Sequence, residues 1–263
     1  MRRIQTFEGF IFEFLKDAWI RKSKVVSKDG SPLTVYHGTN QNFNKFDMSY
    51  FGKTDDGFYG KGFYFTNEKQ DAYDYGDIIL SCNLRIEKPF YLRSYSTVGS
   101  AVELDLRDDL AKLNGMPKDL KTIRTLPKGY HVNRREYKDE NNQEIIEYAV
   151  WPDESLYDTD DEEYGPDIKI YKKDEKSKDS RGELQAIVAF NDMINNVDYA
   201  SGQANWLLQK VDRDNFHEIL KKNGYDGIFV VGAKGDKTPI EEVSEFIVWN
   251  ADQIQIMLKA KKI

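Results

Sequence analysis

The sequence has one cysteine and few histidines, and these absences exclude several kinds of site. Cys82 is the single cysteine in 263 residues, so a disulfide framework and a multi-cysteine zinc site are both excluded. The three histidines, His37, His131 and His217, give little basis for a histidine-rich metal centre. We therefore expect a protein without a bound metal.

Long hydrophobic runs are also missing. No apolar stretch approaches the roughly 18–20 residues that a membrane span requires, so the sequence predicts a soluble protein that does not enter membranes. The apolar N-terminal segment is interrupted by Glu8, Glu13, Lys16 and Asp17, which excludes a signal peptide and favours the cytoplasm. The net charge of -7 argues against sequence-independent coating of DNA, which needs a positive surface, although a local basic patch stays open.

What is present is enough to build a folded core. Hydrophobic residues make up 40% of the chain and aromatic residues 13%. Within residues 1–28 an apolar stripe recurs at helical spacing, which predicts an amphipathic helix: Ile4, Phe7, Ile11, Phe14, Leu15, Ala18 and Trp19. This helix would pack on the rest of the protein. The alternative is a docking peptide for a partner, since Phe10 and Phe12 lie off the stripe.

Residues 29–263 are predicted to form one domain with a large charged insertion at about residues 94–180. Strands are expected at residues 32–39, 62–66, 78–92, 225–231 and 244–249, and helices at residues 67–75, 181–195 and 203–222. The insertion is predicted to hold a helix at residues 101–113 and a hairpin at residues 130–150. Strands at both ends that enclose helices indicate an α+β fold with an antiparallel or mixed sheet.

An acidic run in the insertion, from Asp153 to Glu163, lacks the ordered alternation and the glycine of a calcium loop and reads as a solvated loop. Other familiar motifs also fail. Residues 232–238 resemble a phosphate loop only faintly, because Asp236 separates the glycine from the lysine. The glycines at 57, 60 and 62 precede a strand, so they do not form the dinucleotide-binding fingerprint.

Three short segments remain as candidates for chemistry. The first segment is the end of a strand and contains His37 and Gly38. In the second, the side chain of Tyr64 is expected on the other face of its strand from the two neighbouring phenylalanines. The third is an apolar strand that begins with Glu245. Taken singly, each has an ordinary structural explanation: a histidine at a strand end, a core tyrosine with a satisfied hydroxyl, and a carboxylate at a strand edge. It is the order of the three segments along the chain that favours a functional interpretation over these structural ones.

In this order the segments resemble the ADP-ribosyltransferase fold, in the branch of diphtheria toxin and the poly(ADP-ribose) polymerases that carries a His-Tyr-Glu triad on three strands. They look still more like the ADP-ribosyltransferase domains of phage and mobile-element polyvalent proteins. The likeness covers roughly residues 32–92 and 220–256. The segments that carry it are Val35-Tyr-His-Gly-Thr39, Phe46-Asp47, Gly62-Phe-Tyr-Phe-Thr66, residues 72–76, Tyr225-Asp-Gly-Ile228, Glu245-Phe-Ile-Val-Trp-Asn250 and Gln253-Ile254.

The resemblance implies a split, twisted β-sandwich with peripheral helices that binds NAD in a cleft. It implies that His37 hydrogen-bonds an NAD ribose, that Tyr64 lines the nicotinamide pocket, and that Glu245 binds the 2′-hydroxyl of the nicotinamide ribose. These three would be the catalytic residues. The residues implied to bind NAD are His37, Gly38, Thr39, Tyr64 and Tyr75, with Gly38 acting through its main chain and Tyr75 stacking on the nicotinamide.

A carboxylate beside the ribose suits this chemistry, because cleavage of the nicotinamide–ribose bond develops positive charge at the anomeric carbon. The sequence departs from its relatives at two positions. Ala72 stands where the polymerases have a serine that holds the nicotinamide amide, and Val243 stands where arginine-modifying relatives have a second acid. The second departure makes arginine a poorer acceptor.

The expected activity is therefore NAD-dependent mono-ADP-ribosylation of a macromolecule, with protein preferred over nucleic acid as the acceptor. Two alternatives stay open: an NAD glycohydrolase, in which water is the acceptor, and a catalytically silent module that binds NAD or a partner. A phage or mobile-element source would make the protein a toxin-like effector in the host-cell cytoplasm.

Overall fold

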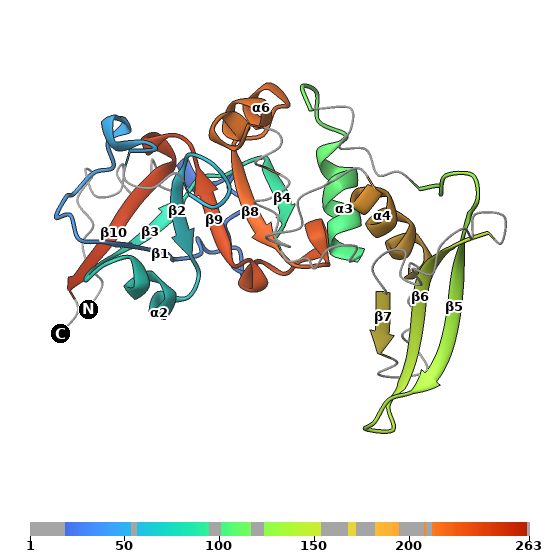
Figure 1. The fold of residues 1–263 in the computed structure, drawn as a ribbon. Helices are drawn as coiled ribbons and strands as arrows, with labels where there is room; N and C mark the ends of the chain where they lie inside the picture. Colours follow the sequence, from blue (N-terminus) through green and yellow to red (C-terminus); the bar gives the residue numbers. More distant parts are fainter. Residues whose placement is uncertain are drawn as a thin grey trace, which may run out of the picture. The chain divides into compact units, whose positions relative to one another are not determined.

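A computed structural model describes residues 19–53, 57–94, 101–116, 124–153, 168–171, 182–194, 208 and 212–261 (Figure 1). The chain divides into two compact units, Met1–Leu92 with Leu208–Ile263, and Arg93–Leu207. The predicted helix before Trp19 and the acidic run beyond Asp153 lie outside the described residues. Within the described ranges, no helix is long and apolar enough to cross a membrane.

The first unit is built on a seven-stranded sheet (Figure 1). Its strand order is β10-β3-β1-β2-β9-β8-β4. All five residues of β1 pair with β3, and all four residues of β2 pair with β9, whereas β1 and β2 meet through a single register pair, Tyr36 with Thr66. The sheet is thus divided between β1 and β2. The strands are β1 (Val35–Thr39), β2 (Phe63–Thr66), β3 (Ile78–Leu84), β4 (Pro89–Arg93), β8 (Gly227–Val231), β9 (Glu245–Val248) and β10 (Ile254–Lys261).

One face of this sheet carries the main apolar core of the unit. Side chains of a strand alternate between its two faces, so the buried Phe63 and Phe65 place Tyr64 on the other face. In the same way the buried Phe246 and Val248 place Glu245 on the face opposite the core. The core also takes in residues from the remaining strands and from the loop after β1: Val35, Phe46, Leu80, Cys82, Leu84, Phe229 and Val231.

Two short helical segments pack against the strands. The predicted helix at residues 67–75 begins later, as α2 (Lys69–Ala72), and continues as a 3₁₀ turn, η2 (Tyr73–Tyr75). Helix α6 (Phe216–Lys222) follows the 3₁₀ turn η5 (Arg213–Asn215) and ends before the Asn-Gly pair predicted to stop it. Further 3₁₀ turns are η1 (Met48–Tyr50), η6 (Gly235–Lys237), η7 (Ile240–Glu242) and η8 (Ala251–Gln253).

The first described residue, Trp19, belongs to the apolar stripe expected in the N-terminal helix. Its indole nitrogen donates a hydrogen bond to the main-chain oxygen of Asp252 at 3.2 Å, and the guanidinium of Arg85 lies 5.6 Å from its ring centroid. The end of the stripe is therefore fixed to the turn that precedes β10.

The second unit contains the predicted hairpin and helices. Strands β5 (Tyr130–Lys138), β6 (Glu144–Pro152) and β7 (Ile168–Tyr171) form an antiparallel sheet. Helix α4 (Gly182–Ile194) packs Ala186 and Phe190 against Val150 of β6. The unit extends to Leu207 and so includes α4.

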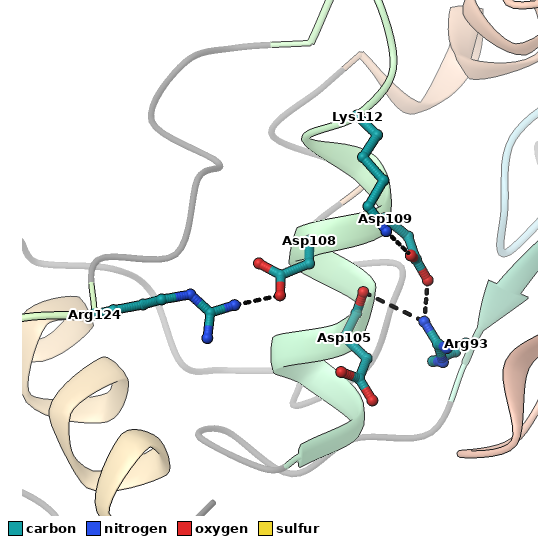
Figure 2. Close-up of polar contacts among 6 residues, drawn as sticks. All are labelled: Arg93, Asp105, Asp108, Asp109, Lys112 and Arg124. Carbon is teal, nitrogen blue, oxygen red and sulfur yellow. Dashed lines mark hydrogen bonds and ion pairs between the residues drawn. The ribbon is translucent and has the colours of Figure 1, made fainter.

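Helix α3 (Ala101–Leu110) of this unit has an acidic face whose charges are balanced by basic side chains (Figure 2). Arg93 forms an ion pair with Asp109 and a 3.4 Å hydrogen bond to the main-chain oxygen of Asp105. Arg124 pairs with Asp108. Because these carboxylates already have cationic partners, we assign the cluster a structural role.

Candidate active site

His37 lies in the middle of β1 with its imidazole against the core. The ring centroid is 5.1 Å from that of Phe46 and 5.5 Å from that of Phe65. Its Nδ1 atom lies 2.9 Å from the main-chain oxygen of Tyr64. Burial lowers the pKa of His37 below its usual value, which favours the neutral ring at pH 7. Since a carbonyl oxygen can only accept, Nδ1 carries the proton and Nε2 is left as an acceptor.

Gly38 allows the segment that carries Tyr75 to lie directly on β1. A Cβ atom at Gly38 would collide with the main-chain oxygen of Ala72 and would lie 3.1 Å from Cβ of Tyr75. Only glycine permits this approach without displacing η2. Tyr75 is 66% exposed, so this residue lies next to Gly38 with a large surface open to solvent.

The phenol of Tyr64 fastens the loop that precedes β2. Its hydroxyl donates to the main-chain oxygen of Gly60 and accepts a 3.1 Å hydrogen bond from the main-chain nitrogen of Tyr59. Gly57, at φ 63°, packs so closely on the phenol that a Cβ atom there would overlap it. Both hydrogen bonds of the hydroxyl are therefore used within the protein.

Glu245 is the first residue of β9 and lies between two neighbouring strands, in register with Thr66 of β2 and Val230 of β8. The side chain is half-buried, and burial raises the pKa of its carboxyl above the usual value. Among the residues that the structure describes, none forms a hydrogen bond or ion pair with this carboxylate. A desolvated carboxylate without a partner is typical of functional sites.

Strands β1, β2 and β9 are consecutive in the sheet, so the structure gathers the three predicted catalytic residues onto neighbouring strands. His37 is joined to Tyr64, but through the main chain of Tyr64 and not through its phenol. Tyr64 and Glu245 share one face of the sheet. Thr39, which the resemblance implied to bind NAD, is buried, and its hydroxyl accepts a 3.0 Å hydrogen bond from the main-chain nitrogen of Gln41.

Two other residues of the matching segments have structural roles. The carboxylate of Asp226 accepts 2.8 Å hydrogen bonds from the main-chain nitrogens of Glu87 and Lys88. The buried amide of Gln253 makes four hydrogen bonds to main-chain atoms, with Arg85 O, Asp226 O, Trp249 N and Asn250 N. The resemblance implied no role for these two residues, and the structure shows that they hold together the ends of β3, β8, β9 and β10.

Nucleophilic catalysis by the cysteine finds little support. Cys82 is buried, and burial raises the pKa of its thiol to about 12, so it is not an activated nucleophile. The described ranges contain no group of three or more His, Cys, Asp or Glu side chains that could hold a metal ion. Within the predicted catalytic residues, the Glu245 carboxylate and the Nε2 atom of His37 have no hydrogen-bond partner among the residues that the structure describes.

Comparison with known proteins agrees with the resemblance seen in the sequence. The family model described as ADP-ribosyltransferase in polyvalent proteins matches residues 27–260. No curated protein matches the chain, and no solved structure does. The match spans both structural units, and the mostly antiparallel divided sheet is consistent with the fold that the family implies. The chain belongs to the family of ADP-ribosyltransferases in polyvalent proteins.

Proposed function

We propose that the protein transfers a single ADP-ribosyl unit from NAD to a macromolecular acceptor, with protein preferred over nucleic acid, and releases nicotinamide. The observation that carries the proposal is Glu245: a half-buried carboxylate without a partner in the described ranges, on the same sheet face as Tyr64. Its raised pKa reflects the desolvation that strengthens electrostatic stabilisation of a nearby positive charge.

In this mechanism the bond between the nicotinamide nitrogen and the anomeric carbon breaks, and its electron pair leaves with neutral nicotinamide. The Glu245 carboxylate stabilises the positive charge that develops on the ribose. The acceptor then forms a bond to the anomeric carbon and loses a proton, which Glu245 or water takes up. Because the leaving group departs neutral, the site needs no strong general acid.

The other residues bind and orient NAD. The Nε2 atom of His37 accepts a hydrogen bond from a ribose hydroxyl, since Nδ1 is already bonded to Tyr64. The exposed ring of Tyr75 stacks on the nicotinamide, and the main chain of Gly38 holds its amide. Tyr64 lines the pocket with its ring, while its hydroxyl holds the loop before β2.

The experiment uses the protein with NAD labelled on the adenine side and a bacterial lysate, and follows free nicotinamide and macromolecular label together. Three proteins are compared: the wild type, Glu245→Gln, and the control Glu242→Gln, whose exposed carboxylate pairs with Lys234. We expect wild type and control to release nicotinamide and to label a macromolecule, and Glu245→Gln to lose both by orders of magnitude.

Other outcomes separate the alternatives. Nicotinamide release without macromolecular label would replace the proposal with NAD glycohydrolysis. If the wild type releases no more nicotinamide than Glu245→Gln, the protein is a binding module and the proposal fails.

A further inference from the structure

Asn67 connects two parts of the site that are far apart in the sequence. It directly follows β2 and comes two residues before α2. Its side-chain nitrogen donates a 2.7 Å hydrogen bond to the main-chain oxygen of Glu241, a residue of η7. The two residues are 174 positions apart.

On one side of this hydrogen bond lies the turn that leads to Tyr75. Thr66 pairs with Glu245 across the sheet, and its hydroxyl accepts a 3.0 Å hydrogen bond from the main-chain nitrogen of Glu68. These two contacts therefore fix the turn between β2 and α2 next to Glu245. The helical segment that it starts ends at Tyr75, next to Gly38.

On the other side lies the segment that enters β9. Glu241 precedes Glu245 by four residues. This segment is held to β8, because the nitrogen and the hydroxyl of Ser244 both donate to the main-chain oxygen of Val230, at 3.0 and 3.2 Å. Val243 is fully buried in the core. The amide of Asn67 adds a hydrogen bond that joins this segment to the residue directly after β2.

We propose that Asn67 is a positioning residue of the transfer site: by holding the main chain at Glu241, its amide sets how Glu245 lies relative to the segment that carries Tyr75. The inference rests on the proposed function, because it assumes that Glu245 acts on the ribose while Tyr75 binds the nicotinamide. A carboxylate that stabilises a developing charge must be placed accurately, and small displacements cost rate more than binding.

The test compares three substitutions at Asn67 by the steady-state kinetics of nicotinamide release. Asn67→Asp keeps the shape but replaces the donor by an oxygen, and Asn67→Ala removes the group without adding charge. We expect kcat to fall by about ten-fold in both, with KM for NAD changed by less than about three-fold. Asn67→Gln keeps an amide donor on a partly exposed side chain and is expected to recover most of the rate.

The matched control is Lys28→Ala. Lys28 contacts the same residue, with its amine 3.6 Å from a carboxylate oxygen of Glu241, but the lysine side chain is 81% exposed. An exposed ion pair contributes little, so kcat is expected to stay at the wild-type value. If Lys28→Ala lowers kcat as much as Asn67→Ala, or if neither Asn67→Ala nor Asn67→Asp lowers it, the inference is overturned.

Hydrogen exchange provides a readout that does not depend on activity. Loss of the tie is expected to speed amide exchange in residues 242–246 in Asn67→Ala but not in Lys28→Ala. A wild-type protein that releases no nicotinamide would refute the proposed function, and exchange would still decide whether Asn67 holds this segment. Unchanged exchange in Asn67→Ala would refute the inference even in an active enzyme.

Discussion

The Nδ1 atom of His37 donates to the main-chain oxygen of Tyr64, which fixes the proton of a neutral imidazole on that nitrogen. The bond crosses the point where β1 and β2 separate after their single register pair. The histidine therefore has two roles that different substitutions can separate: it ties the two halves of the sheet together, and it presents Nε2 as an acceptor.

Replacing His37 by asparagine is expected to keep the tie and remove the acceptor, because the asparagine amide can place a donor where Nδ1 lies. The apparent Kd for NAD should rise about three- to ten-fold, the value for loss of one ordinary hydrogen bond. Isothermal titration measures this directly. The control His131→Asn, at an exposed histidine of the second unit, should bind NAD as the wild type does. Equal affinities for His37→Asn and wild type would remove His37 from the binding site.

The ionised carboxylate of Glu245 is expected to destabilise the folded protein. Its pKa is raised by burial, so the folded state holds the proton more tightly than the unfolded state. Stability therefore falls as the pH rises above the ordinary pKa of an unfolded-state glutamate, about 4.3, and the full penalty is present above the folded-state pKa. Glu245→Gln, which cannot ionise, should melt at a higher temperature than wild type at pH 8.

The same comparison at low pH provides the check. Below about pH 4 both states of the wild type are protonated, so the difference in melting temperature between Glu245→Gln and wild type should disappear. A difference that stays constant from pH 4 to pH 8 would mean that the carboxyl group is not desolvated. Activity should depend on pH in the complementary sense: nicotinamide release should fall on acidification, with a midpoint above the ordinary glutamate value, because only the carboxylate stabilises positive charge.

Removal of the Tyr64 hydroxyl should loosen the loop before β2. In Tyr64→Phe the main-chain groups of Gly60 and Tyr59 each lose their hydrogen bond to the hydroxyl, which should lower the free energy of unfolding by about 1–2 kcal/mol. The ring remains, so binding of nicotinamide through stacking should be retained. Chemical denaturation measures the loss, and Tyr50→Phe, at a tyrosine that is 63% exposed, is the control. A Tyr64→Phe protein as stable as Tyr50→Phe would contradict the fastening role.

The sequence predicted the strands that carry the site because they are short apolar runs bounded by turn residues. The hairpin of β5 and β6, the helix α4 and the end of α6 before Asn223 were also confirmed. The edge strand β10 was missed. It contains exposed residues such as Leu258, it carries a bulge between Ile256 and Leu258, and its pairing with β3 depends on residues about 175 positions earlier.

The site was less predictable than the fold. The resemblance implied that His37, Tyr64 and Glu245 lie on three separate strands, but it could not show that Tyr64 uses its hydroxyl within the protein. Nor could it show that Gln253 serves the main chain or that Asn67 reaches Glu241. Such contacts depend on loops that approach one another only after folding, and no local pattern encodes them.

The close approach of Gly38 to Ala72 leaves no room for a side chain at position 38. An alanine at position 38 would place its Cβ atom against the main-chain oxygen of Ala72, and backbone cannot yield as a flexible side chain can. Gly38→Ala should therefore displace η2 from β1 and move Tyr75 away from the nicotinamide. We expect a loss of about 1–3 kcal/mol in stability, typical of overpacking, and a larger loss of NAD affinity than in His37→Asn.

Gly232→Ala is the matched control for this substitution. Gly232 follows β8, and a Cβ atom there would meet nothing within 4 Å. The Gly232→Ala protein should therefore fold and bind NAD as the wild type does. It controls for the general effect that replacing a glycine by alanine has on the unfolded chain. Thermal melts separate displacement of η2 from unfolding: a Gly38→Ala protein that melts near the wild-type temperature but does not bind NAD has lost the placement of Tyr75. Normal binding by that protein would mean that the contact between β1 and η2 does not position the nicotinamide.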